Sequence, residues 1–219
     1  MGRPTARLNT EHFIGGNMLE FLSKGGVLVG PILFCSVIAL AIFLERLIRF
    51  ARVSFKGSGL PEKVIRFIEE GKEDLALETA QHSDSPIGRV LAGALEVRGQ
   101  DRKVVENVIA HTIDEAVRGL SRYLQTLATI GSITPMLGLL GTVTGMIKSF
   151  MVIQQMGGKV NAAVLAGGIW EAMLTTALGL AVALPAMVAH SYLDSRVDRF
   201  EVQIRTAVIS LAKSMGGRL

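Results

Sequence analysis

Residues 160–193 read VNAAVLAGGIWEAMLTTALGLAVALPAMVAHSYL, and this stretch decides the fold because it holds no Asp, Lys or Arg and only one carboxylate, Glu171. A helix needs about 20 apolar residues to cross a bilayer, so the stretch is long enough to span one. A carboxylate there must face a protein-lined or watery cavity, or be protonated, since a charge at the bilayer centre costs about 2.5–3.5 kcal/mol. Glu171 is therefore a candidate ion or proton site.

Two further uncharged runs, 25–44 and 123–147, are also long enough to cross a bilayer. The composition agrees, because 49% of the 219 residues are apolar, 19% are charged and the mean hydropathy is +0.42. Such a chain is too apolar for an ordinary soluble domain. We predict an all-α membrane protein with three transmembrane helices, two of them extended into a cytoplasmic helical bundle.

Basic residues near the ends of the spans predict the orientation, because Lys and Arg gather on the cytoplasmic side. The predicted membrane-surface anchors, which would also bind anionic lipids, are Arg46, Arg49, Arg52, Arg122 and Arg196. The net charge of +4 is explained by these anchors, and no nucleic-acid partner is expected. The predicted order is a periplasmic N-terminal segment (1–24), helix 25–44, a cytoplasmic helical region (45–122), helix 123–147, a short periplasmic loop (148–162), helix region 163–193 and a cytoplasmic C-terminal helix (194–219).

The cytoplasmic region contains Gly and Pro breakers that divide it into short helices near 62–70, 72–81 and 87–98. From residue 101 an apolar helical repeat continues into the second span without a Gly-Pro break, and a similar repeat follows the third span. Both spans are therefore expected to extend as long rods into the cytoplasm, where their apolar stripes pack together and against the short helices. The stripes are Val105, Ile109, Ala116, Leu120, Leu124 and Leu127 in the first rod, and Leu193, Val197, Phe200, Ile204, Val208 and Leu211 in the second.

Small and hydroxylated residues share one face of the second span and one face of the third, at 100° per residue. Close helix packing explains such stripes. A pore wall explains them too, because hydroxyls and a carboxylate can hold water or pass protons. The proton-pathway candidates are Glu171, Thr142, Thr176, Thr175 and Thr134. The pore or packing face comprises Gly131, Gly138, Gly141, Gly145, Ala172, Gly179 and Ala183.

Other side chains point to no further chemistry. His12, His82 and His111 lack metal-ligand spacing with one another and with Cys35, so we expect no metal site. We also expect no cofactor and no enzymatic activity. Trp170 leaves the depth of Glu171 open, because tryptophan favours the membrane interface and would place its neighbour near the headgroups.

The segments 131–150, GSITPMLGLLGTVTGMIKSF, and 168–185, GIWEAMLTTALGLAVALP, resemble the signature of the MotA/TolQ/ExbB proton-channel family, closest to its ExbB and TolQ branch. The resemblance implies a pentamer in the bacterial inner membrane, surrounding the single helices of an ExbD/TolR-like partner that bears an aspartate. Thr142, Glu171 and Thr176 match the family's second-span threonine, third-span glutamate and third-span threonine. Thr144 departs from the pattern, since the best-known ExbB members have tryptophan there.

By this resemblance the proton-motive force would drive the partner helices and act on envelope machinery, with a TonB/TolA-like protein as a further partner. Nutrient import, envelope constriction and surface motility all fit, and sodium is not excluded as the coupling ion. The alternative is a non-conducting scaffold for an envelope or signalling partner. An intramembrane enzyme lacks support, because the sequence has no paired intramembrane aspartates and no Ser/His pair.

Overall fold

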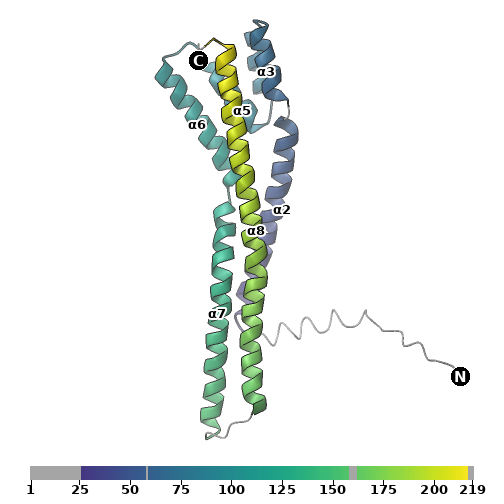
Figure 1. The fold of residues 1–219 in the computed structure, drawn as a ribbon, viewed down its shortest axis with the longest axis vertical. Helices are drawn as coiled ribbons and strands as arrows, with labels where there is room; N and C mark the ends of the chain where they lie inside the picture. Colours follow the sequence, from purple (N-terminus) through teal and green to yellow (C-terminus); the bar gives the residue numbers. More distant parts are fainter. Residues whose placement is uncertain (1–25, 58, 158–161, 217–219) are drawn as a thin grey trace, which may run out of the picture. The chain divides into compact units, whose positions relative to one another are not determined.

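The computed structural model describes residues 26–57, 59–157 and 162–216, which form the helices labelled in Figure 1. Their bounds are α2 Val29–Gly57, α3 Leu60–Glu69, α4 Glu73–Gln81, α5 Pro86–Glu96, α6 Arg102–Ser121, α7 Leu124–Gln155 and α8 Ala162–Ser214. These described ranges contain no strand, which confirms the all-α prediction. The predicted N-terminal segment (1–24) lies outside the described residues, as do 158–161 of the predicted loop.

Within the described residues, three helices are long and apolar enough to cross a membrane, as the sequence predicts. They correspond to Val29–Val53, Leu124–Gln155 and Leu165–Ser214. The α7 helix continues to Gln155, past the predicted end of the span at residue 147. Lys148 marks where the uncharged run stops, but a lysine is a good helix former and does not end a helix.

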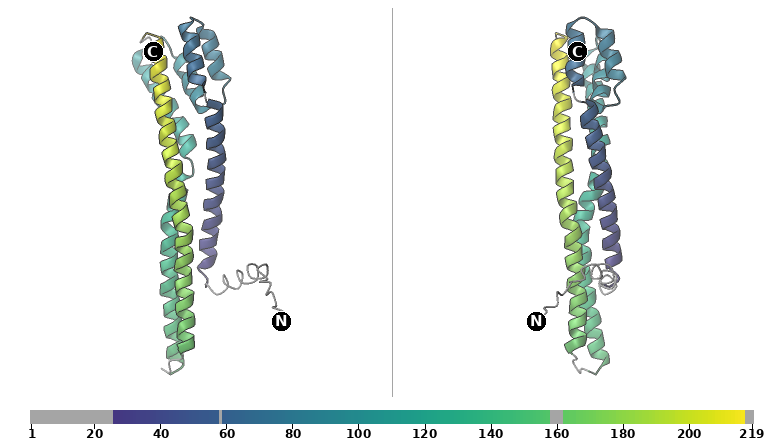
Figure 2. Two further views of the ribbon diagram at one scale, coloured as in Figure 1. Left: turned by 45° about the vertical axis from the view of Figure 1, so that its right-hand side comes forward. Right: turned by 90° about the vertical axis from the view of Figure 1, so that its right-hand side faces the viewer.

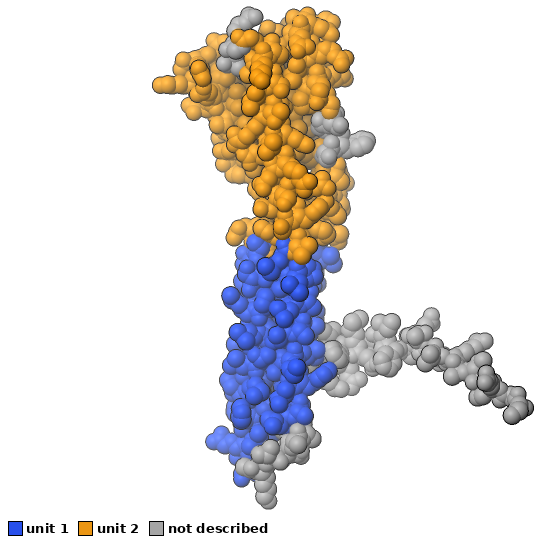
Figure 3. Space-filling model, viewed as in Figure 1, with its two compact units in different colours: residues 1–40, 128–187 blue, residues 41–127, 188–219 orange. Residues whose placement is uncertain are grey.

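The chain divides into two compact units (Figure 3). Unit 1 contains residues 1–40 and 128–187, and its described part holds the start of α2, most of α7 and the first half of α8. Unit 2 contains residues 41–127 and 188–219, with the helices α3 to α6, the first residues of α7 and the ends of α2 and α8. Because α2 and α8 each contribute to both units, the apolar spans continue as helix into unit 2.

Unit 2 is a helical bundle organised around α5. Most residues of α5 are buried, because nearly all of them are apolar and the helix packs against α3, α4 and α6. Ser85 caps its N-terminus by accepting a hydrogen bond from the Gly88 N–H at 3.1 Å. The short helices predicted near 62–70, 72–81 and 87–98 are confirmed as α3, α4 and α5. Both predicted apolar stripes are buried, except that Ile109 is half-buried.

The prediction of one unbroken helix from residue 101 through the second span was wrong. The α6 helix ends at Ser121 and α7 begins at Leu124, because Tyr123 adopts a left-handed backbone with φ +66°. That conformation costs a non-glycine residue about 1–2 kcal/mol. The guanidinium groups of Arg46 and Arg122 lie 5.4 Å and 4.8 Å from the centre of the Tyr123 ring, and these cation–π contacts offset part of the cost.

Arg46 differs from its expected position at the lipid surface. Its side chain is only 1% exposed, and its guanidinium donates hydrogen bonds to the carbonyl oxygens of Gly119 (3.2 Å) and Leu120 (3.3 Å). These carbonyls lie at the end of α6, where a helix has no backbone donors left to satisfy them. Arg46 therefore caps α6 and binds protein instead of lipid. Its charge is balanced by the Glu45 carboxylate at 2.6 Å.

Candidate functional site

The candidate site lies in unit 1, where α7 and α8 pack side by side in antiparallel directions (Figure 2). Glycines bring the two backbones together. A methyl carbon on Gly138 would lie 3.0 Å from the Thr176 Cα atom, and one on Gly145 would lie 3.1 Å from the Ala172 Cβ atom. Small residues allow this close approach within a membrane, where the packing itself holds helices together. The predicted small-residue faces thus meet each other within one chain.

Two of the predicted pathway threonines are buried between these helices. Thr134 is 0% exposed and Thr175 is 2% exposed. The Thr134 hydroxyl donates to the Ile130 carbonyl at 2.8 Å, and the Thr175 hydroxyl donates to the Glu171 carbonyl at 2.7 Å. Each hydroxyl is therefore satisfied by its own helix. The structure places both threonines in the helix contact rather than on an open face.

The other two, Thr142 and Thr176, are half-buried and reach the surface of the helix pair. The Thr142 hydroxyl donates to the Leu139 carbonyl at 2.6 Å. The Thr176 hydroxyl crosses between the helices and donates to the Gly138 carbonyl at 3.0 Å. In an α-helix that carbonyl also accepts the backbone N–H four residues on, which belongs to Thr142. The Gly138 carbonyl therefore accepts hydrogen bonds from the Thr176 hydroxyl and from the Thr142 backbone N–H.

These hydrogen bonds fix what the hydroxyls of Thr142 and Thr176 can offer a neighbour. A carbonyl oxygen carries no hydrogen, so each hydroxyl must use its single hydrogen in the bond. Only the oxygen lone pairs remain available. The exposed side of both threonines is therefore a hydrogen-bond acceptor.

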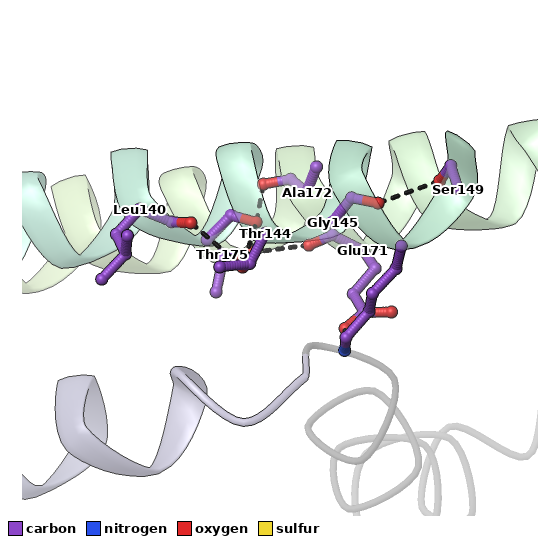
Figure 4. A network of polar contacts seen from close by, with 9 residues as sticks. Leu140, Thr144, Gly145, Ser149, Glu171, Ala172 and Thr175 are labelled. Carbon is purple, nitrogen blue, oxygen red and sulfur yellow. Dashed lines mark hydrogen bonds and ion pairs between the residues drawn. The ribbon is translucent and has the colours of Figure 1, made fainter. Parts of the chain in front are cut away.

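Glu171 lies on α8 and is paired with Lys148 on α7. The Lys148 ammonium lies 3.1 Å from the Glu171 carboxylate, and the two side chains are 57% and 28% exposed. Figure 4 shows the Glu171 side chain turned toward the segment that precedes α2. There the carboxylate packs against Gly26, which has φ +74° and leaves no room for a Cβ atom beside the carboxylate.

The contact with Gly26 also bears on the depth of Glu171. The first span begins with α2 at Val29, so Glu171 lies level with the start of that span. Trp170, beside it, is 52% exposed, as expected for a ring at a membrane interface. Measured along α8, Glu171 lies inside the candidate span that begins at Leu165, so its position differs between the two helices.

Lys148 is the residue of this site that the sequence interpretation missed, because it counted only as a loop charge. The sequence alone does contain a signal for the pairing of Lys148 with Glu171. Lys148 is the only cation in residues 123–158, and Glu171 is the only anion in residues 160–193. Two antiparallel helices joined by a short connection bring such positions together. The described residues contain no group of three His, Cys, Asp or Glu that could hold a metal ion.

The remaining predicted residues lie as follows. Gly131 and Gly179 also face the partner helix in the α7–α8 contact, and Gly141 packs against the side chain of Thr175. Ala172 and Ala183 are buried. In unit 2, the side chains of Arg49, Arg52, Arg122 and Arg196 are exposed, as a surface anchor must be. The Arg196 guanidinium stacks on Tyr192 at 5.2 Å.

Comparison with known proteins finds relatives that match most of the chain. An ExbB-like protein of Synechocystis sp. is 36% identical over 80% of this chain and 70% of its own length. The biopolymer transport protein ExbB of Salmonella typhimurium is 30% identical over 81% of the chain and 75% of its own length. An ExbB homologue of Methanothermobacter thermautotrophicus is 30% identical, and the match spans 65% of that relative's length. Residues 82–206 match a family model, so the chain is a membrane protein that belongs to the MotA/TolQ/ExbB proton channel family.

Proposed function

We propose that the chain is the proton-channel subunit of an ExbB-like complex that couples the proton-motive force to mechanical work on envelope machinery. Five copies would surround the transmembrane helices of an ExbD/TolR-like partner in the bacterial inner membrane, and a TonB/TolA-like protein would receive the movement. The N-terminus would be periplasmic and the C-terminus cytoplasmic. The exposed arginines of unit 2 support this orientation, because Lys and Arg favour the cytoplasmic side of a membrane.

The observation that carries this proposal is the acceptor character of Thr142 and Thr176. A partner aspartate is a hydrogen-bond donor only while its carboxyl group is protonated. Thr142 and Thr176 can therefore bind the neutral aspartate without giving up their bonds to Leu139 and Gly138. An ionised aspartate brings only acceptors, so it meets repulsion from these lone pairs.

This difference can convert protonation into movement. When the aspartate loses its proton, the threonine site releases it and the partner helix shifts to a place with water or donors. Protonation from the other side of the membrane returns it.

Replacement of both threonines by valine tests the proposal. We expect Thr142→Val with Thr176→Val to lower proton flux at least about tenfold, since two hydrogen bonds worth about 1 kcal/mol each are removed. The measurement is the internal pH of liposomes that are loaded with a pH-sensitive dye. Their membrane carries the chain purified together with its single-span partner. Thr144→Val is the matched control, because Thr144 is exposed but lies about 200° around the α7 helix from Thr142 and so faces away from it. That variant should keep most of the flux.

Normal flux in the double valine variant would contradict the role of the threonines. A stable wild-type complex with the partner and no flux above that of empty liposomes would instead favour the alternative function, a non-conducting scaffold. Both results require that size-exclusion chromatography first show an intact complex.

A further inference from the structure

The Lys148–Glu171 pair is the only pair of charges in the described part of unit 1. Residues 26–40, 128–157 and 162–187 contain one cation, Lys148, and one anion, Glu171. These two side chains come from different helices and bind each other at 3.1 Å. Two charges from different helices that meet in this way indicate a specific contact, since neither has another charge to pair with in this part of the chain.

The carboxylate of Glu171 is confined on two sides. Gly26 closes one side, because even a Cβ atom there would collide with the carboxylate. Lys148 closes the other, from α7. The nearest hydroxyls turn elsewhere (Figure 4), since Thr175 donates to the Glu171 and Ala172 carbonyls and Ser149 donates to the Gly145 carbonyl. Lys148 is therefore the cation that sets where the ionised carboxylate lies.

We propose that Lys148 is a positioning residue and that the Lys148–Glu171 pair is a latch between α7 and α8 that opens when Glu171 is protonated. This inference rests on the proposed function and adds a regulated step to it. In the closed latch the ammonium and the carboxylate are both charged. A Glu171 oxygen then takes a proton from a hydronium ion, which leaves a water molecule, and the carboxylate becomes a carboxylic acid. Lys148 keeps its own proton, loses the ionic attraction and moves into the solvent to which its side chain is already 57% exposed.

Few other groups can take part in this titration. Besides Lys148 and Glu171, the only titratable side chain in the described residues of unit 1 is Cys35 on α2, which is half-buried. Loss of the proton from Glu171 restores the carboxylate and closes the latch again. The latch therefore gives Glu171 two positions, one for each protonation state.

Chemical labelling of Lys148 tests the latch without a partner protein. The full chain in liposomes is treated with an acetylating reagent at constant pH, and modification of Lys148 is measured by mass spectrometry. Glu171→Gln removes the negative charge while keeping the size of the side chain, so we expect Lys148 to react about three- to fivefold faster. Lys103 on α6 is exposed and serves as the internal reference. Equal rates of Lys148 acetylation in the wild type and in Glu171→Gln would overturn the proposal.

Proton flux through the complex with the partner tests whether opening of the latch is needed for proton transfer. Lys148→Gln should reduce flux about fivefold or more, and Lys148→Arg should keep at least half of it because arginine preserves the cation. If arginine failed as badly as glutamine, the requirement would not be for a positive charge and the latch would be rejected. Normal flux in Lys148→Gln would also reject the latch while leaving the proposed function intact. A wild-type complex without flux would reject the proposed function itself.

Discussion

Gly179→Ala should destabilise the protein by about 2–3 kcal/mol, although it adds a single methyl group. A methyl carbon on Gly179 would lie 2.6 Å from the Thr134 carbonyl oxygen and 3.2 Å from the Gly138 Cα atom. Both are backbone atoms, which cannot rotate away as a side chain does, so α7 and α8 must separate. Overpacking of a well-packed contact typically costs 1–3 kcal/mol. The measurement is the free energy of unfolding in detergent from denaturant titration.

Gly167→Ala is the matched control for this prediction. Gly167 lies on the same helix, but a methyl group there meets no atom within 4 Å. Alanine is a better helix former than glycine by up to about 1 kcal/mol, so this variant should be neutral or slightly more stable. Similar losses in both variants would show that the α7–α8 contact does not depend on close approach at Gly179.

Arg46→Met should cost about 2–3 kcal/mol, because methionine keeps the apolar stem but loses the hydrogen bonds to Gly119 and Leu120. Hydrogen bonds from a charged group are worth about 1.5–3 kcal/mol, and the loss leaves the last carbonyls of α6 without this donor. The stacking on Tyr123 is lost as well. We expect a lower free energy of unfolding and faster hydrogen exchange at the backbone amides around residues 120–125.

Arg49→Met, three residues further on α2, provides the comparison, because Arg49 is exposed and surface substitutions usually change stability by less than about 0.5 kcal/mol. Arg46→Lys separates charge from geometry. Lysine keeps the charge but lacks the planar fork, so an intermediate loss is expected. A wild-type exchange rate in Arg46→Met would contradict the capping role.

Much of the fold could be predicted from the sequence because hydrophobic runs and helical periodicity are local properties. The three apolar helices and the buried stripes of unit 2, such as Leu193 to Leu211, follow from them. The break at Tyr123 could not be predicted in this way. Tyrosine has no preference for a left-handed backbone, and its stacking partner Arg46 is distant in sequence. Long-range contacts therefore decided where the helix ends.

In the candidate site, too, the sequence predicted local features but not the contacts between helices. Periodicity placed the glycines and threonines on one face of each helix, but it gave only the angle of each side chain and not its partner. The structure separates Thr134 and Thr175, which are buried in the helix contact, from Thr142 and Thr176, which reach the surface. The proton-pathway role of these residues stays a prediction. The bond from Thr176 to Gly138 depends on the approach of two backbones, which no single-helix pattern contains.

The pairing of Lys148 with Glu171 has an electrical consequence. A voltage of 100 mV does about 2.3 kcal/mol of work on one elementary charge that crosses the whole membrane. The described residues of unit 1 carry one positive and one negative side chain at the same level, so the pulls on them cancel. A static field therefore exerts almost no net force on these helices. The field can do net work only on an additional charge, such as a proton that binds Glu171.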